Sequence, residues 1–147
     1  MISGAHLVRL RLPSSFDLLD LVQLVSDRLS GLAGLDEDST HWVSVAVRES
    51  VINAIKHGNR EAADKHVTVE FRLAPTPAAP AGELVVEVLD EGEGFEPTEV
   101  GNPLDPENML KSSGRGIFFM RNFMDDVAIE RRPEGGMCVR LSKRVAS

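Results

Sequence analysis

The chain has 147 residues, 42% of them hydrophobic and 27% charged, as expected of one globular domain. A formal net charge of -7 argues against broad electrostatic binding to nucleic acid or anionic lipid, but it leaves nucleotide binding open. The only cysteine, Cys138, cannot form an internal disulfide and is expected to be a buried small apolar residue. Because the sequence contains no long apolar run and no signal-peptide pattern, we expect a cytoplasmic protein.

Alternating apolar residues, helical spacing and turn residues predict the elements in chain order. Capping residues are expected to start the helices, and glycines to end them. The Pro-rich stretch 75–82 predicts an exposed loop, and no period is sustained over 92–113. The predicted elements are a strand over 7–12, a helix from Ser14 or Ser15 to Gly31 or Gly34, a helix from about 36 to 57 ending at Gly58-Asn59, strands over 67–72 and 84–89, a short helix over 117–123, and strands over 127–130 and 137–145.

This order predicts an α+β fold. With no repeat and no linker, we expect a single domain over residues 1–147. Its helices are expected to pack on one face of a mixed, largely antiparallel sheet, which makes a two-layer sandwich.

The second predicted helix carries the first candidate site. At about 100° per residue, Glu49, Asn53 and Lys56 share one face, opposite an apolar face that can pack on the sheet. A carboxylate one turn from a carboxamide suits Mg²⁺, or a general base beside such an ion. A solvated helix face is the alternative for this spacing alone.

Two glycine-containing stretches provide further candidates. Residues 90–95, Asp-Glu-Gly-Glu-Gly-Phe, follow a strand directly, and their two glycines would let a ligand approach the backbone closely. The Asp90 carboxylate could then accept a hydrogen bond from an adenine amino group. Residues 112–117, Ser-Ser-Gly-Arg-Gly-Ile, begin a helix whose free N–H groups could meet phosphate oxygens, with Lys111 and Arg115 adding positive charge. A surface turn and a glycine helix cap are the respective alternatives, and neither stretch is a Walker loop or a G-x-G-x-x-G fingerprint.

The order of these three stretches resembles the N, G1 and G2 boxes of the GHKL ATPases, which share the Bergerat ATP-binding fold. The matching stretches are 49–54 with His57-Gly58-Asn59, then 90–95, and then 114–117. A strand and a helix before the N box, together with residues 116–127, make the chain similar to the anti-sigma-factor serine kinases of bacterial partner-switching systems. The resemblance extends from about Leu7 to Lys143.

The resemblance implies a role for each matching residue. Asn53 would hold the Mg²⁺ that bridges the ATP phosphates, and Glu49 would be the base that orients or deprotonates the attacking hydroxyl. Asp90 would bind the adenine amino group, while Gly92 and Gly94 would let the turn close over the base.

The phosphates would be bound further along the chain. Gly114 and Gly116 would bring backbone N–H groups to them, with Lys111 or Arg115 adding charge and residues 96–113 forming the ATP lid. His57, which closes the N box, is expected to be structural or to bond near the phosphates.

The same resemblance implies partners and an activity. The family's usual substrate is a serine of a STAS-domain antagonist protein, its target is a sigma factor, and its members commonly form homodimers. The chain is therefore expected to be a protein serine/threonine kinase that uses ATP and Mg²⁺, without direct binding to nucleic acid or membrane.

Two other functions compete with this one. Some relatives carry an arginine where this chain has Ser112, which leaves open a nucleotide-binding adaptor that acts by docking without efficient phosphoryl transfer. The catalytic domain of a histidine kinase would need a phosphoacceptor histidine on a dimerising helical pair, for which 147 residues leave no room. Loss of transfer in Glu49→Gln, with nucleotide binding retained, would distinguish the kinase from the adaptor.

Overall fold

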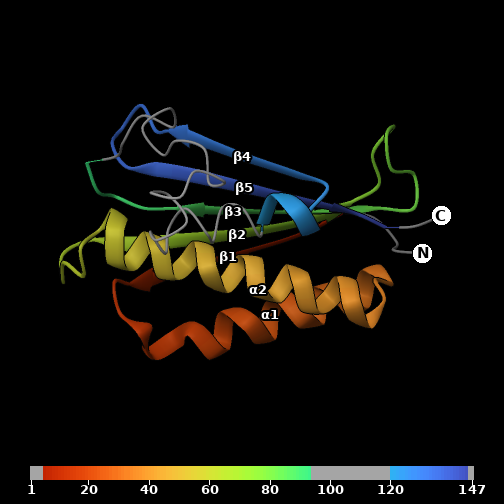
Figure 1. Cartoon of the computed structure of the whole chain (residues 1–147), viewed down its shortest axis with the longest axis horizontal. Helices are drawn as coiled ribbons and strands as arrows, with labels where there is room; N and C mark the ends of the chain where they lie inside the picture. The colour runs from red at the N-terminus through yellow and green to blue at the C-terminus, as the bar shows by residue number, and fades with distance from the viewer. Residues whose placement is uncertain (1–4, 94–119, 146–147) are drawn as a thin grey trace, which may run out of the picture.

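The computed structural model describes residues 5–93 and 120–145, and those residues form two layers (Figure 1). A 3₁₀ turn, η1 (Phe16–Leu18), leads into the first helix, and a π-helical turn, η2 (Ala54–Gly58), follows the second. The longer elements are β1 (His6–Pro13), α1 (Leu19–Ala33), α2 (Glu37–Asn53), β2 (His66–Ala74), β3 (Glu83–Leu89), β4 (Asp126–Arg131) and β5 (Met137–Arg144).

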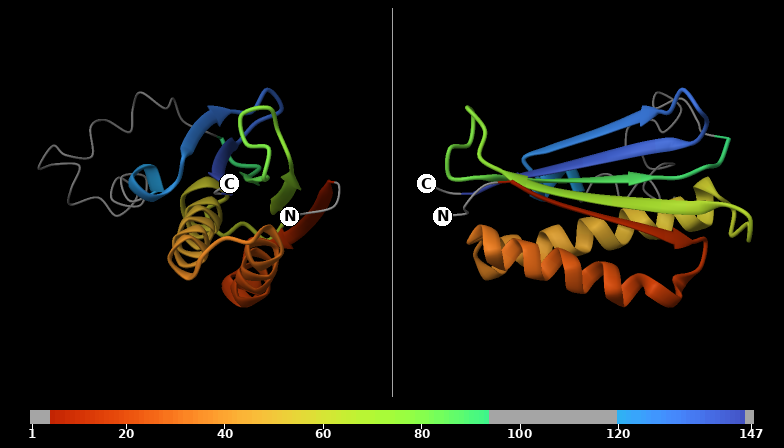
Figure 2. Two further views of the ribbon diagram at one scale, coloured as in Figure 1. Left: turned by 90° about the vertical axis from the view of Figure 1, so that its right-hand side faces the viewer. Right: turned by 180° about the vertical axis from the view of Figure 1, so that it is seen from behind.

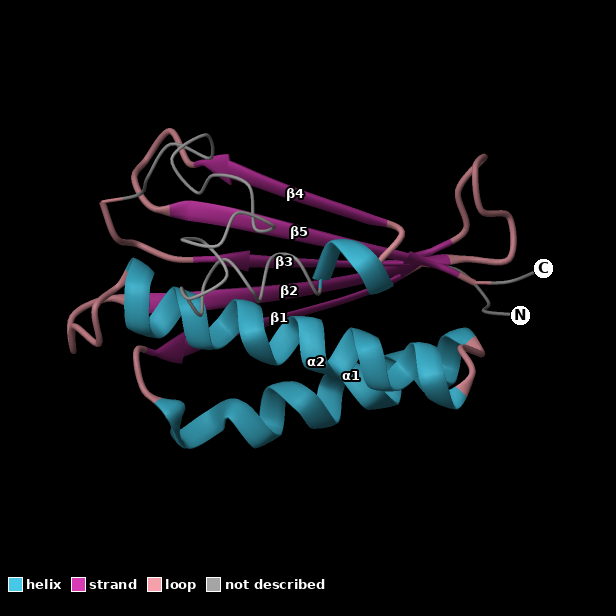
Figure 3. Ribbon diagram, in the orientation of Figure 1, coloured by secondary structure: helices cyan, strands magenta, loops and turns pink. Residues whose placement is uncertain are grey.

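The strands form one five-stranded sheet in the order β1-β2-β3-β5-β4. Each of its neighbouring pairs is antiparallel, so the described strands contain no parallel pair of the kind that a mixed sheet would have. Helices α1 and α2 lie side by side on one face, while the opposite face carries no helix in the described ranges (Figures 2 and 3). The predicted α+β architecture, with helices on one face of a largely antiparallel sheet, is confirmed.

The core lies between the two layers. Strands β2 and β3 alternate buried and less buried residues, and the buried set, which includes Phe71 and Val86, packs against α1 and α2 residues such as Val22 and Val47. The outer sheet face carries ion pairs such as Arg9–Glu70, at 2.7 Å, which add little stability where they are solvated. Cys138 is 9% exposed, as expected, and its burial, with Glu87 nearby, raises the pKa of its thiol to about 11.

The helices begin at the capping residues that the sequence suggests. The Ser15 hydroxyl accepts from the Asp17 N–H at the start of η1, and the Asp36 carboxylate accepts from the Ser39 N–H at 2.7 Å at the start of α2. Helix α1 continues through Gly31 and ends at Gly34, whose φ of +84° is the left-handed conformation that glycine adopts readily. None of the described helices combines the length and the apolarity needed to cross a membrane.

Candidate functional site

A pocket of about 70 Å³ lies between the C-terminal end of α2 and strands β3, β4 and β5. Most of its wall is apolar, with a few polar side chains from α2, η2 and the end of β3. Such a mixture suits a flat heterocyclic ligand whose orientation is fixed by a small number of hydrogen bonds. The pocket is lined by Ser50, Asn53, Ala54, His57, Gly58, Val88, Asp90, Met120, Ile129, Met137 and Val139.

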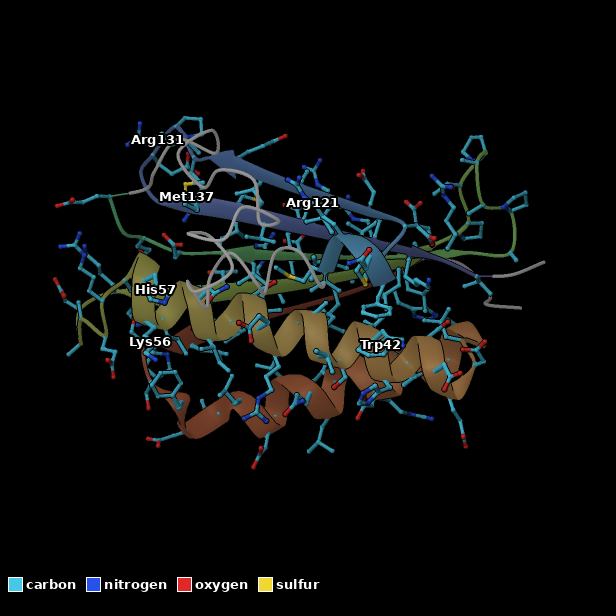
Figure 4. All side chains as sticks on the ribbon, viewed as in Figure 1. Trp42, Lys56, His57, Arg121, Arg131 and Met137 are labelled. Atoms are coloured by element: carbon cyan, nitrogen blue, oxygen red, sulfur yellow. The ribbon has the colours of Figure 1, made fainter. Side chains whose placement is uncertain are left out.

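The end of α2 differs from the predicted regular helix to residue 57. The α-helix ends at Asn53, and in η2 the Asn59 N–H donates to the Ala54 carbonyl at 2.8 Å, a bond five residues back. This wide turn changes the phase of the helix, so His57 lines the pocket whereas Lys56 does not. Figure 4 shows these two side chains at different sides of the helix end. Of Glu49, Asn53 and Lys56, which were predicted to share one face, only Asn53 lines the pocket.

Asp90 is held firmly at the end of β3. It is only 5% exposed, and its Oδ1 accepts hydrogen bonds from the N–H groups of Gly92 at 3.0 Å and Met137 at 3.1 Å. Within the described ranges its Oδ2 accepts no hydrogen bond. Burial raises the pKa of this carboxyl, while the two backbone donors and the charges of Arg132 and Lys65 oppose the rise. One oxygen is thus fixed by the protein, and the other is available to a donor in the pocket.

Two glycines let the Asp90 turn pack against the end of α2. A Cβ at Gly92 would lie 1.9 Å from the Gly58 carbonyl oxygen, and a Cβ at Gly58 would lie 2.3 Å from Asp90 Oδ2. A side chain at Gly92 would therefore displace the backbone at Gly58, and one at Gly58 would displace the Asp90 carboxylate. The sequence interpretation of Gly58 as a helix stop missed this contact, because it depends on a partner 32 residues further along the chain.

Asn59 is a site residue for which the sequence predicted only a helix stop and the end of the N-box stretch. Its side chain is 1% exposed, and its Oδ1 accepts from the Glu91 N–H at 2.7 Å. Its Nδ2 donates to Ser14 Oγ and to the His66 carbonyl, both at 2.9 Å. The side chain thereby joins the ends of β1 and α2, the start of β2 and the turn after Asp90.

We expect Asn59→Ala to lower the free energy of unfolding by about 2–3 kcal/mol, because it removes three hydrogen bonds and leaves buried polar groups unpaired. Urea denaturation followed by circular dichroism measures this change. A loss below about 0.5 kcal/mol, the range of ordinary surface substitutions, would contradict the anchoring role.

Glu49 and Asn53 stand one turn apart on α2. Asn53 is half-buried and lines the pocket, whereas Glu49 is half-buried but is not part of the wall. In the described part of the chain, the Glu49 carboxylate has no hydrogen bond and no ion pair. No described residue therefore occupies this carboxylate.

The helical turn over 120–123 is attached to α2 by two contacts. The rings of Trp42 and Phe123 stack with their centroids 3.7 Å apart and an angle of 2° between planes, and Ser50 Oγ lies 3.1 Å from Met120 Sδ. The two aromatic rings thus pack against each other within the protein. Met120 reaches the pocket wall from this turn.

Several predicted site residues lie outside the described residues. They are Gly94, Lys111, Gly114, Arg115 and Gly116, together with Ser112 and the predicted lid over 96–113. The described residues bring together Asn53, His57, Asp90 and Gly92, with Glu49 one turn away.

A family model described as "Histidine kinase-like ATPase domain" matches residues 12–143. The "Anti-sigma F factor" of Bacillus velezensis is 36% identical over 123 residues, which cover 80% of this chain and 79% of that protein. The "Serine-protein kinase RsbW" of Listeria innocua is 27% identical over 131 residues, which cover 83% of this chain and 78% of that protein.

Among solved structures, the chain is similar to the RsbU and RsbW domains of a Mycobacterium tuberculosis protein, with a TM-score of 0.64 and 16% identity. The match covers 95% of this chain but only 32% of that longer one. At this identity the likeness supports the fold alone.

Proposed function

Because the chain belongs to the family of histidine kinase-like ATPase domains, we propose that it is an anti-sigma-type protein kinase that transfers the γ-phosphate of Mg-ATP to a serine of a partner protein. The observation that carries this proposal is the free Oδ2 of a buried Asp90 in the pocket that Asn53 also lines, with Glu49 one helical turn away. Groups for adenine recognition and metal binding would then share one pocket, with a base one helical turn away.

The adenine base of ATP fits the apolar part of the pocket. Val88, Ile129 and Val139 would pack against its ring, and Asp90 Oδ2 would accept a hydrogen bond from its exocyclic amino group. The Gly92 and Met137 N–H groups both donate to Oδ1, so Oδ2 is the oxygen that would accept from the base. A hydrogen bond to a charged, desolvated acceptor contributes more than a neutral one, which would give a preference for adenine over guanine.

The residues present fit a magnesium ion that arrives with the nucleotide. Among residues 5–93 and 120–145 no group of three His, Cys, Asp or Glu side chains could hold a metal by itself. Mg²⁺ commonly takes one or two protein oxygen ligands and completes its shell with phosphate and water. The Asn53 carboxamide oxygen would supply such a ligand, and the bound ion would neutralise charge on the phosphates.

Glu49 would act on the acceptor serine. Its carboxylate would take the proton of the serine hydroxyl as the serine oxygen forms a bond to the γ-phosphorus and the bond from that phosphorus to the β–γ bridging oxygen breaks. ADP leaves with the electron pair of the broken bond, and the serine becomes a phosphate ester. Glu49 is half-buried and has no partner among residues 5–93 and 120–145, which leaves it available for this role.

Residues outside the described ranges complete the proposed site. Gly94 would help close the turn over the base, while Gly114 and Gly116 would offer N–H groups to the phosphates. Lys111 or Arg115 would add positive charge, and residues 96–113 would form the lid. His57, on the pocket wall, would bond near the phosphates.

The names of the relatives suggest the biological setting. One is named an anti-sigma factor and another a serine-protein kinase, so we propose that this chain binds a sigma factor or a similar regulatory target. Its phosphoacceptor would be a STAS-domain antagonist. The chain would form a homodimer and would act in the cytoplasm. The whole of residues 1–147 would act as one ATP-binding kinase domain.

The proposal is tested by a phosphoryl-transfer assay. A pull-down in ATP and in ADP, followed by mass spectrometry, identifies the partners, and each purified partner is then incubated with the chain and labelled Mg-ATP. We expect label on a serine of the antagonist. A verified antagonist that forms a complex with the chain but receives no phosphate would overturn the kinase proposal and favour the docking adaptor.

A further inference from the structure

The turn between β4 and β5 encloses the Asp90 turn on the side away from α2. Within it the Arg132 N–H donates to the Gly136 carbonyl at 2.9 Å. Gly136 has a φ of +90°, and a Cβ there would lie 2.1 Å from the Asp90 carbonyl oxygen. The Asp90 N–H also donates to the Met137 carbonyl at 3.0 Å. The β4–β5 turn is therefore in direct backbone contact with the proposed adenine-recognition residue.

Arg132 makes the side-chain contact between the two turns. Its Nη1 donates to the Asp90 carbonyl, and its Nη2 donates to Glu134 Oε1 at 3.2 Å. The Nε is buried and has no partner in the described residues, and the side chain is only 20% exposed. Burying an unpaired N–H is unfavourable, so a surface ion pair with Glu134 does not by itself explain this position.

The Asp90 carbonyl and the Glu91 N–H belong to one peptide group, and that group is held at both ends. Arg132 donates to its carbonyl oxygen, and Asn59 Oδ1 accepts from its N–H at 2.7 Å. The two side chains come from opposite sides, one from the end of α2 and the other from the β4–β5 turn. Fixing both ends of a peptide plane restricts rotation about the bonds on either side of it. The Asp90 Cα–C bond is one of them.

We propose that Arg132 is a positioning residue for nucleotide recognition, which with Asn59 holds the Asp90–Glu91 peptide so that Asp90 Oδ2 faces the pocket. This inference rests on the proposed function, because it assumes that Asp90 accepts the adenine amino group. Arg132 itself does not line the pocket, so it acts through Asp90 and not by touching the ligand.

The variants Arg132→Met and Arg132→Lys test this role. Arg132→Met keeps an apolar stem but removes the donors, whereas Arg132→Lys keeps one charged donor without the planar fork. Arg140→Met is the matched control, because Arg140 is on β5 of the same hairpin, faces the outer side of the sheet and pairs with Glu87 at 3.6 Å. Dissociation constants for ATP and GTP are measured by calorimetry, and melting temperatures by circular dichroism.

We expect Arg132→Met to weaken ATP binding about tenfold and to reduce the preference for ATP over GTP by a similar factor. Arg132→Lys should recover part of both, and Arg140→Met should match the wild type. A purely structural role would lower the affinities for ATP and GTP together and leave their ratio unchanged. If Arg132→Met does not fold, an Arg132→Lys variant with a reduced ATP preference supports the role.

Two results separate failure of this inference from failure of the proposed function. If the wild type binds no ATP, the proposed function is wrong and this inference is wrong with it. If the wild type binds ATP and Asp90→Asn weakens that binding, but neither Arg132 variant changes the ATP preference, only the inference about Arg132 is overturned.

Discussion

Glu49→Gln is expected to abolish phosphoryl transfer to the partner serine while leaving ATP affinity within about twofold of the wild type. The glutamine side chain has the same shape but cannot accept the serine proton at neutral pH, and removing a general base typically costs about 10²- to 10⁴-fold in rate. Because Glu49 is not part of the pocket wall, nucleotide binding should not depend on it. Single-turnover transfer of labelled phosphate measures the rate, and calorimetry measures the affinity.

Glu130→Gln is the matched control for this experiment. Glu130 is an exposed residue of β4 that is not part of the pocket wall, so the same change there should leave the transfer rate unaltered. Transfer by Glu49→Gln at the wild-type rate would remove Glu49 from the mechanism. If Glu49→Gln lost both the partner complex and phosphoryl transfer, Glu49 would instead be assigned to docking.

The fold follows from local patterns that need no knowledge of distant contacts. The alternation in β2 predicts which residues face the helices, and Ser15 and Asp36 mark the helix starts through bonds to N–H groups two or three residues away. Gly31 was wrong as a stop signal, since glycine is tolerated within a helix when neighbouring residues pack well. Only Gly34 adopts the left-handed conformation that ends α1.

The supports of the candidate site could not be predicted in this way. Asp90 and Gly92 stand out because a carboxylate and a glycine follow a strand directly, but the roles of Gly58, Asn59 and Arg132 depend on contacts with residues 32 to 45 positions away. A single sequence carries no signal for such pairs. The π-helical turn was not predicted either, and its last residue, Gly58, lies against Asp90.

The second large effect is expected for Asp90→Asn, which should weaken ATP binding by about 10- to 100-fold. Oδ1 accepts from the Gly92 and Met137 N–H groups, so the amide oxygen of asparagine is expected to occupy that position and its NH₂ group the position of Oδ2. The NH₂ group would then face the adenine amino group, and two donors cannot pair. It could donate to a guanine carbonyl, so the preference for ATP over GTP should fall or reverse.

The melting temperature of Asp90→Asn distinguishes weaker recognition of the base from unfolding of the variant. Burial raises the pKa of Asp90, which means that the charged carboxylate is disfavoured where it stands. A neutral side chain of the same shape removes that cost, so the melting temperature of Asp90→Asn should equal or exceed that of the wild type at neutral pH. Weak ATP binding with an unchanged or higher melting temperature would therefore locate the defect in recognition of the base. If the variant is stable and binds ATP as tightly as the wild type, Asp90 does not bind the adenine amino group, and the base must be recognised elsewhere.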